Sequence, residues 1–579
     1  MPNTNVGVNP PNPNPASEPA SKLGRSWLSF CKEKHDCGFE KSPESMPKRL
    51  LKVRKMDDSP KVSVSVVESS SIGQTPYAAL SYCWGSRGQK LLLTQDTYEL
   101  LKTGIDVQDL QPTIRDAATV AATLEISYLW VDALCILQDN NTDKASEIPR
   151  MSKIYGNACL TIVASRAAAV EDGFLNLRPL LASSQPNRSF QVTYNIGPEK
   201  HGLVIVPIFK EENEPWESRA WTLQERLFSK RVLKYGTLNT TYICHGGRER
   251  DVYAASDGWK GLDGELTQKR KGTGVDKEKS MSDITQILQQ VDFMSALDSS
   301  SVAVELGKMK REDVLKSWYE LVGAYSKRNI TVPLDRLPAM SGIAQSFASA
   351  LQDNYFSGHW QSNLAYDLMW ARLSSQSPER PSQYTGPSWS WAGYPGGAYY
   401  NSVWRSSTAD PEFAILSCRS ELMYSEAPFG AVKSSCLQVR GYLAPVDLKF
   451  LNEVEALGLN SMLDRTRLEE ELKKIVPSKS PSPEHLSREC LDMWMDYRDK
   501  DTGFPQSVFL LVIAHDNGDP AGLILLRNEN GDFSRLGVFR YVWSTLRRTD
   551  QENDDDFEQR RSIGIKRWWG NRSADITMI

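Results

Sequence analysis

Residues 113–139 read TIRDAATVAATLEISYLWVDALCILQD, and this stretch decides the fold class. Its first half repeats apolar residues every three or four positions, which predicts a helix with one buried face. The run from Tyr128 to Ile136 is almost wholly apolar, as in a strand that is covered on both sides. A helix followed at once by such a strand is typical of proteins that alternate strands and helices around a parallel sheet.

The neighbouring segments continue this alternation. Upstream, residues 77–85 (YAALSYCWG) predict a buried strand. Downstream, a helix ending near Gly156 precedes a third buried strand at 160–165, and a helix at about 216–228 precedes a strand at 231–235. We therefore expect a parallel sheet with helices on both faces, joined by right-handed crossovers.

Composition divides the chain into four parts. Residues 1–22 are rich in Pro, Asn and Ser, which predicts a disordered tail, and residues 23–256 hold the α/β domain. Residues 257–282 are rich in Gly and Lys, as in a solvated linker. Residues 283–579 predict a helical segment, with one helix at 311–325, and then a smaller antiparallel β region.

Composition and charge exclude several classes of protein. The 579 residues carry a net charge of −4, so no global attraction to nucleic acid or to an anionic membrane is expected. No apolar run is long enough to span a bilayer, and the first residues lack the apolar core of a secretory signal. Nine scattered cysteines fit reduced thiols inside a cell, and we expect a cytoplasmic protein.

Four segments together resemble the fungal heterokaryon incompatibility (HET) domain. They are 77–85 (YAALSYCWG), 113–139, 151–165 (MSKIYGNACLTIVAS) and 218–227 (SRAWTLQERL), in this order. The resemblance covers about residues 77–235. Weaker similarity extends it over most of the chain, and neither a Walker A loop nor a WD repeat is present, as in a stand-alone HET protein.

The resemblance implies a role in non-self recognition between fungal strains, a form of innate immunity that ends in programmed cell death. It also implies protein partners in incompatibility signalling, and possible self-association. Two molecular readings stay open, an enzyme and a non-enzymatic scaffold that signals by assembly. A hydrolase that uses Cys135 as a nucleophile, with His245, is a third and weaker alternative.

The order of elements is also similar to a TIR domain, which has a flavodoxin-like fold. Several TIR domains cleave NAD at the nicotinamide bond with a glutamate in a W-C-L-x-E segment. This chain matches that segment at Trp221, Leu223 and Glu225, with Thr222 in place of Cys and a long insertion before Ser218. The similarity implies NAD as a substrate, with no cofactor and no metal.

Glu225 is the candidate catalytic residue. Cleavage of an N-glycosidic bond builds positive charge on the ribose, and a fixed carboxylate stabilises that charge or traps it covalently. Trp221 and Glu225 lie four positions apart, so a helix places them on one face. The alternative is a glutamate that is solvated or paired with a basic neighbour.

Other candidates follow from the predicted sheet, since ligands of open parallel sheets lie beyond the carboxyl ends of the strands. Asp132, expected within the second buried strand, would bind a ribose hydroxyl. An aromatic ring after the first strand would stack on a base, a glycine there would admit a phosphate, and an arginine would bind phosphate. Structural roles are the alternative for each. The substrate-binding candidates are Ser81, Tyr82, Trp84, Gly85, Asp132, Arg219 and Trp221.

Two further patterns are open to more than one reading. Cys31, His35 and Cys37 offer three zinc ligands, but a structural site needs a fourth and none is obvious nearby. The predictions therefore include no metal, and metal binding by these three residues is left open. Trp389 and Trp391 alternate with serines, which predicts a strand with both rings on one face and packed in a core.

Overall fold

The structure is a computed structural model of the chain. It describes residues 12–35, 37, 46–55, 62–178, 189–195, 201–207, 214–244, 247–250, 306, 309–372, 383–400, 408–447, 491–495, 507–516, 519–541 and 573–579. The chain forms two compact units, Met1–Glu305 and Leu306–Ile579. Within the described ranges, no helix has the length and apolar character needed to cross a membrane.

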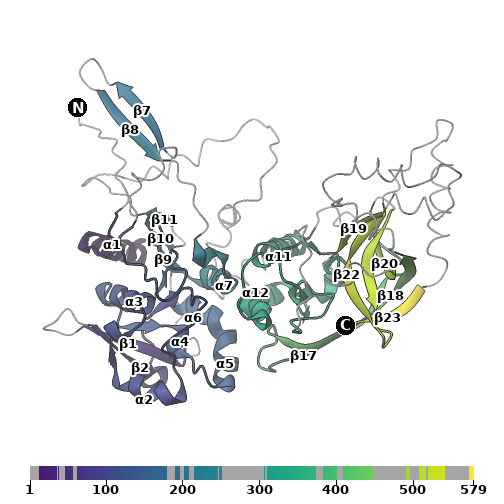
Figure 1. The fold of residues 1–579 in the computed structure, drawn as a ribbon, viewed down its shortest axis with the longest axis horizontal. Helices are drawn as coiled ribbons and strands as arrows, with labels where there is room; N and C mark the ends of the chain where they lie inside the picture. The colour runs from purple at the N-terminus through teal and green to yellow at the C-terminus, as the bar shows by residue number, and fades with distance from the viewer. Residues whose placement is uncertain are drawn as a thin grey trace. The chain divides into compact units, whose positions relative to one another are not determined.

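A nine-stranded mixed sheet forms the centre of the first unit (Figure 1). Its strands lie in the order β11-β10-β9-β6-β3-β5-β1-β2-β4. Their bounds are β1 Arg49–Lys55, β2 Val62–Glu68, β3 Ala78–Ser81, β4 Ile105–Asp106, β5 Tyr128–Trp130, β6 Leu160–Val163, β9 Arg231–Tyr235, β10 Thr240–Cys244 and β11 Gly247–Arg250.

The parallel part of this sheet comprises β5, β3, β6 and β9. Counted along the chain, these strands lie in the order second, first, third, fourth. All four residues of β3 are buried, which explains why its sequence is apolar on both faces. The prediction of a parallel sheet is therefore correct for the centre. It is wrong for the edges, where β1, β2, β4, β10 and β11 pair antiparallel.

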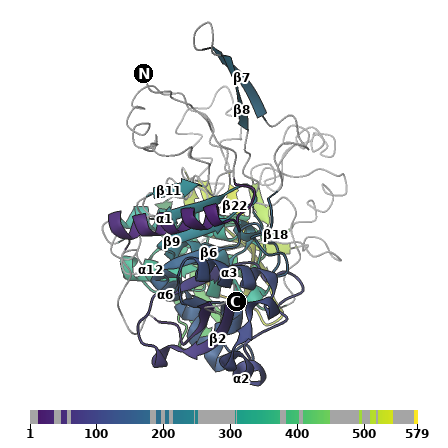
Figure 2. The ribbon, with the colours of Figure 1, turned by 90° about the vertical axis from the view of Figure 1, so that its left-hand side faces the viewer.

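Helices cover the sheet on two sides. Figure 1 shows α1 and α3 on one side and α6 and α7 on the other, and Figure 2 looks onto the side that carries α1. This arrangement matches the expected covering of both faces. The helices are α1 Glu18–Lys34, α2 Gln95–Thr103, α3 Pro112–Thr123, α4 Asp132–Cys135, α5 Asn141–Glu147, α6 Met151–Asn157 and α7 Trp221–Phe228.

Two expectations for this unit are corrected. Asp132 does not lie in the second strand, because β5 ends at Trp130 and Asp132 begins the short helix α4. The apolar run continues after the strand because α4 is itself buried at Ala133, Leu134 and Cys135. A helix also begins inside the segment predicted to be disordered, where Ser17 caps the first turn of α1.

The insertion between β6 and α7 contains an antiparallel hairpin of β7 (Ser189–Asn195) and β8 (His201–Pro207). Other expectations lie outside the described residues, namely the tail up to residue 11 and the boundaries at 256 and 282.

The second unit combines helices with a larger sheet. Its α-helices are α11 (Arg311–Tyr325), which has the predicted bounds, α12 (Ser341–Leu351) and α13 (Leu364–Asp367). Strand β18 pairs with both β23 and β20, so β20, β21, β22, β23 and β18 close into a ring. The strands are β12 Tyr355–Phe356, β13 His359–Trp360, β14 Ala371–Arg372, β15 Ala398–Tyr399, β16 Thr408–Ala409, β17 Ala414–Leu422, β18 Val432–Asp447, β19 Leu491–Met495, β20 Ser507–Asp516, β21 Asp519–Arg527, β22 Phe533–Tyr541 and β23 Ser573–Met578.

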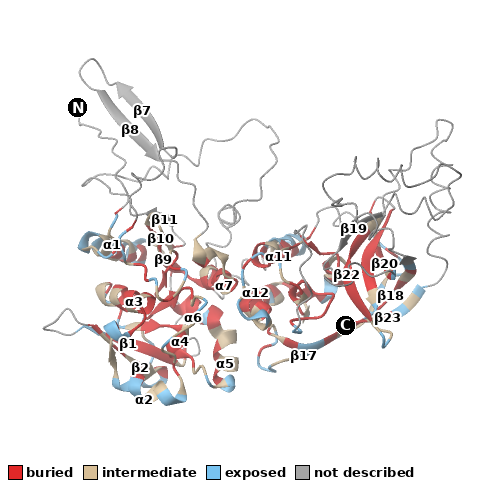
Figure 3. Ribbon diagram, viewed as in Figure 1, coloured by how far each residue is buried: buried red, intermediate tan, exposed pale blue. Residues whose placement is uncertain are grey.

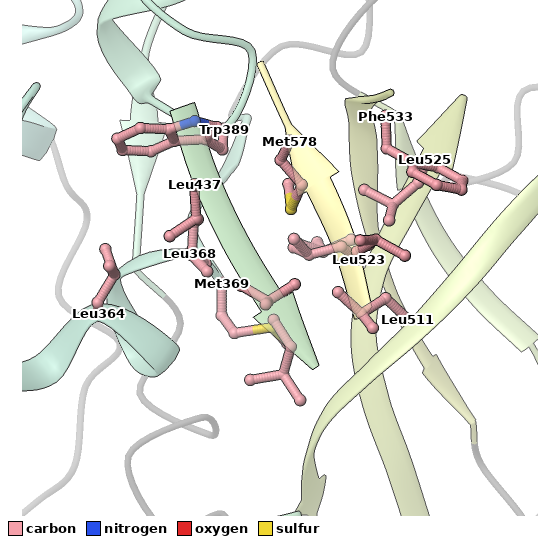
Figure 4. Packing of buried hydrophobic residues seen from close by; sticks show 14 of the residues in the cluster. Leu364, Leu368, Met369, Trp389, Leu437, Leu511, Leu523, Leu525, Phe533 and Met578 are labelled. Carbon is pink, nitrogen blue, oxygen red and sulfur yellow. The ribbon is translucent and has the colours of Figure 1, made fainter. Parts of the chain in front are cut away.

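The core of the second unit fills this ring and continues to α13 (Figure 4). Leu511, Leu523 and Leu525 from neighbouring strands are fully buried there. Figure 3 shows buried stretches in red on the strands of this sheet. Trp389 joins the same cluster, and Trp391 is also buried, so the prediction of core packing is confirmed. They do not lie on a strand, because Trp391 begins a 3-10 helix capped by Ser390.

Candidate functional site

Several predicted site residues gather where β3 and β5 end. Ser81 is the last residue of β3, and Tyr82 follows it. Asp132 begins α4 just after β5, which pairs parallel with β3. Glu225 reaches the same place from α7, 144 positions after Ser81. Because adjacent parallel strands end at the same edge of a sheet, distant parts of the sequence meet there.

Glu225 is held by a short chain of hydrogen bonds. The indole Nε1 of Trp216 donates to the Ser81 hydroxyl oxygen at 2.6 Å, and the Ser81 hydroxyl donates to Oε2 of Glu225. Ser81 is fully buried and Glu225 is 7% exposed. The carboxyl group is therefore fixed in position rather than solvated, and the expectation that it is a simple surface glutamate is excluded.

Burial raises the pKa of Glu225 to about 7, from an ordinary value of 4.5. The hydrogen bond from Ser81 and the positive charge of Arg219 oppose this increase in the pKa, and the charge of Asp132 adds to it. A carboxyl group with such a pKa exists in both protonation states near neutral pH. This property suits acid–base or electrostatic catalysis.

Asp132 and Trp84 form a second pair beside this network. Trp84 Nε1 donates to Oδ2 of Asp132 at 2.9 Å, and the backbone amide of Ala133 donates to Oδ1 at 2.7 Å. Burial raises the pKa of Asp132, although both hydrogen bonds act to lower it. Trp84 and Asp132 are both partly exposed, so this pair lies at the solvent-facing edge of the cluster.

Arg219 connects the helix with the loop after β3. Its Nη1 donates to the backbone oxygen of Tyr82 at 2.5 Å. The Tyr82 side chain is buried, its hydroxyl accepts a hydrogen bond from Gln89 at 3.0 Å, and burial raises its pKa well above the ordinary value. Trp221 is the first residue of α7 and is partly exposed.

Gly85 is required by local packing. Its φ of +82° lies in the left-handed region, and a Cβ built there would lie 2.5 Å from Cβ of Ala169. The side of Gly85 that lacks a side chain therefore faces another loop of the protein. This close contact explains why position 85 is a glycine, without a bound phosphate.

Two neighbours of Glu225 were not predicted from the sequence. Trp216 supplies the indole donor from the 3-10 helix Pro215–Ser218, just before the motif that contains Glu225. Tyr155 in α6 lies close enough to Glu225 to lower its pKa by hydrogen bonding. Its place in the mostly buried segment 151–165 could have pointed to this role, because the hydroxyl of a buried tyrosine needs a hydrogen-bond partner.

The cysteines separate into two kinds. Cys135 is fully buried, and this burial raises its pKa to about 12, so it lacks the thiolate character of a nucleophile. His245 lies outside the described residues. Cys31, His35 and Cys37 lie together, and Cys244 of β10 joins them, with all four ligand atoms within 4.8 Å of one another.

Two described cavities lie away from Glu225. One has a volume of about 50 Å³ beneath α1, and the other has about 400 Å³ and is lined by Lys48, Glu68 and Arg150 among others. Neither is lined by a predicted site residue. Glu225 is 7% exposed, so its side chain is almost wholly covered in this conformation.

Comparison with known proteins agrees with the motifs. The family model described as "Heterokaryon incompatibility protein (HET)" matches residues 77–225, a segment that runs from just before β3 to Glu225. Searches of the curated proteins and of the solved structures find no match. The matched segment contains Glu225 and all of the predicted substrate-binding residues. Residues 77–225 of this chain therefore form a heterokaryon incompatibility (HET) domain.

Proposed function

We propose that this HET protein acts in fungal non-self recognition and promotes cell death by cleaving NAD at its nicotinamide bond, with Glu225 as the catalytic carboxylate. The HET domain itself implies a heterokaryon incompatibility-type function. The position of Glu225 supports the proposal of NAD cleavage, because this residue is buried and hydrogen-bonded to Ser81 where the parallel strands end.

The strand order supports this location for a ligand. The order second, first, third, fourth is that of flavodoxin-like sheets, whose ligands bind where the strand order reverses. Here the reversal lies between β3 and β6, and Ser81 ends β3 at that point. TIR domains share this type of sheet.

The proposed reaction breaks the bond between the ribose and the nicotinamide nitrogen. The electron pair of that bond leaves with nicotinamide, and positive charge develops on the ribose. The Glu225 carboxylate stabilises this charge, and water then adds to the ribose and releases a proton. The products are nicotinamide and ADP-ribose.

Neighbouring side chains have proposed roles in binding. Arg219 would hold a phosphate, since a guanidinium matches phosphate oxygens. Trp84 would stack on a base, and Asp132 would accept a hydrogen bond from a ribose hydroxyl. Opening the cluster would release Asp132 from Trp84, because the two are now hydrogen-bonded to each other.

The test follows nicotinamide release from NAD by the concentrated full-length protein. We expect release by the wild type, loss of release in Glu225→Gln, and retention in Glu217→Gln. Glu217 is a suitable control because it lies in the 3-10 helix just before α7 and is paired with Lys234. Release that survives Glu225→Gln in a folded protein would refute the role of this carboxyl group.

A scaffold that signals by assembly is the second candidate. The burial of Glu225 favours it, because a buried carboxyl group bound to Ser81 also serves as a structural element. Expression in fungal cells separates the two functions. Toxicity that persists in Glu225→Gln supports assembly, and toxicity lost together with nicotinamide release supports the enzyme.

A further inference from the structure

The end of helix α1 meets the edge of the sheet at three thiols and one imidazole. Cys31 lies in the last turn of α1, His35 caps the helix, and Cys37 follows two residues later. Cys244 is the last residue of β10 and lies more than 200 positions further along the chain. Their ligand atoms are all within 4.8 Å of one another. We propose that Cys31, His35, Cys37 and Cys244 bind one structural Zn²⁺ ion that fastens α1 to the sheet.

The residue types and spacing fit zinc. A set of three cysteines and one histidine is a standard structural zinc site, with four ligands and no open position. Cys31 and His35 lie four positions apart at the end of a helix, which places them on the same face. The first three residues alone make an incomplete set, and Cys244 supplies the fourth ligand.

The geometry also fits. Zinc–ligand bonds of about 2.0–2.3 Å in a tetrahedron place the ligand atoms about 3.3–3.8 Å apart. His35 Nδ1 and Cys244 Sγ are 3.2 Å apart. The other distances between ligand atoms are at most 4.8 Å, so they would have to shorten only slightly when zinc binds. The Phe30 ring packs edge-on against the His35 imidazole with centroids 5.4 Å apart and orients it.

Burial and charge provide an independent argument. The three cysteines are 1%, 1% and 6% exposed, while His35 is partly exposed and offers an entry path. Three thiolates, a neutral imidazole and Zn²⁺ carry a net charge of −1. Arg231 is 3% exposed, and its Nε donates to Cys31 Sγ at 3.2 Å. Nη1 of Arg231 has no hydrogen-bond partner among the described residues, so a negatively charged zinc site would balance this buried cation.

The proposed role is to hold α1 in place. The buried face of α1 consists only of Gly24, Leu28 and Cys31, and a cavity of about 50 Å³ lies beneath the helix. Few side chains of this helix are therefore fully buried. A metal that joins its end to β10 closes a loop of about 200 residues and stabilises the folded state.

The main test measures zinc by elemental analysis in full-length protein purified without a polyhistidine tag and without chelators. We expect about one zinc ion per chain in the wild type and almost none in Cys31→Ala or Cys244→Ala. Cys159→Ala is the matched control, because Cys159 is buried in the same unit but lies outside the cluster. It should keep its zinc. Zinc-free wild type that does not take up added Zn²⁺ would overturn the proposal.

A second measurement covers the case in which alanine variants fail to fold. Co²⁺ replaces zinc in the wild type, and three thiolate ligands in a tetrahedron give intense visible bands and a thiolate-to-cobalt charge-transfer band. Cys244→His should retain Co²⁺ with bands shifted toward those of a two-thiolate site. Bands unchanged by Cys244→His would exclude Cys244 as a ligand. A disulfide between these cysteines, detected by mass spectrometry of the native protein, would also overturn the proposal.

Discussion

Replacing Glu225 with glutamine should stabilise the first unit much more at pH 8 than at pH 5. In the folded protein the pKa of Glu225 is about 7, raised from 4.5 by burial. Between these two values the folded state holds a proton that the unfolded state has released. The free energy of unfolding therefore falls as the pH rises through this interval.

The magnitude follows from this difference in pKa. Each unit between the folded and unfolded values is worth about 1.4 kcal/mol, so a rise from 4.5 to about 7 corresponds to about 3 kcal/mol. Glutamine has the shape of a protonated glutamate, and its oxygen accepts the hydrogen bond from Ser81 without ionising. We expect the variant to be more stable than the wild type by less than about 1 kcal/mol near pH 5 and by about 3 kcal/mol near pH 8.

The assay must report on one unit, because a chain with two units does not unfold in a single step. Urea unfolding at each pH is followed by a brief pulse of a thiol reagent at one fixed pH. Mass spectrometry then measures labelling of Cys83 and Cys159, which are buried in the first unit. Glu99→Gln, an exposed change in α2, reports the effect of losing a surface carboxylate.

Two results would refute the reasoning. A stability difference between variant and wild type that stays constant from pH 5 to pH 8 would mean that burial does not raise the pKa of Glu225. A variant that is less stable than the wild type at pH 8 would mean that Arg219 and Ser81 stabilise the carboxylate by more than burial destabilises it.

Four further outcomes are expected. Ser81→Ala removes a hydrogen bond that lowers the pKa of Glu225, so the pH midpoint of the stability profile should move above 7, and a move below it would contradict this contact. Gly85→Ala should cost about 3 kcal/mol in thermal unfolding, because strain and a steric clash add, whereas Gly73→Ala, with nothing within 4 Å, should cost about 1 kcal/mol from strain alone. Leu523→Ala should destabilise the second unit by about 2–5 kcal/mol, measured by urea unfolding, since the side chain is fully buried. If the protein cleaves NAD, the rate should rise with pH through about 7 as Glu225 ionises, and a rate that falls over this range would contradict a role for the carboxylate.

The centre of the sheet was predictable because its signals are local. Strands that are buried on both faces are apolar throughout, and this pattern located β3, β5 and β6. The same signal failed at Asp132. A short buried helix after a strand is as apolar as the strand itself, so periodicity alone does not separate the two.

Contacts between distant segments were less predictable. The sequence placed Glu225 on a helix, but its bond to Ser81 and the donor Trp216 depend on how that helix meets β3. Cys244 was equally hard to predict as the fourth member of the Cys31–Cys37 cluster, because it lies on a strand far along the chain. The antiparallel edges of the sheet were missed because pairing partners, rather than local patterns, decide strand direction.

The 144 positions between Ser81 and Glu225 also affect how the protein is made. Ribosomes add about 5–20 residues per second, so β3 precedes α7 by roughly 7–30 seconds of synthesis. During this delay the nascent chain contains Ser81, the loop after β3 and Asp132, but not the carboxyl group of Glu225. A chain that stops before α7 lacks the residue proposed to act on NAD. Translation that ends early would therefore give the cell a fragment in which Ser81 has no Glu225 to bond.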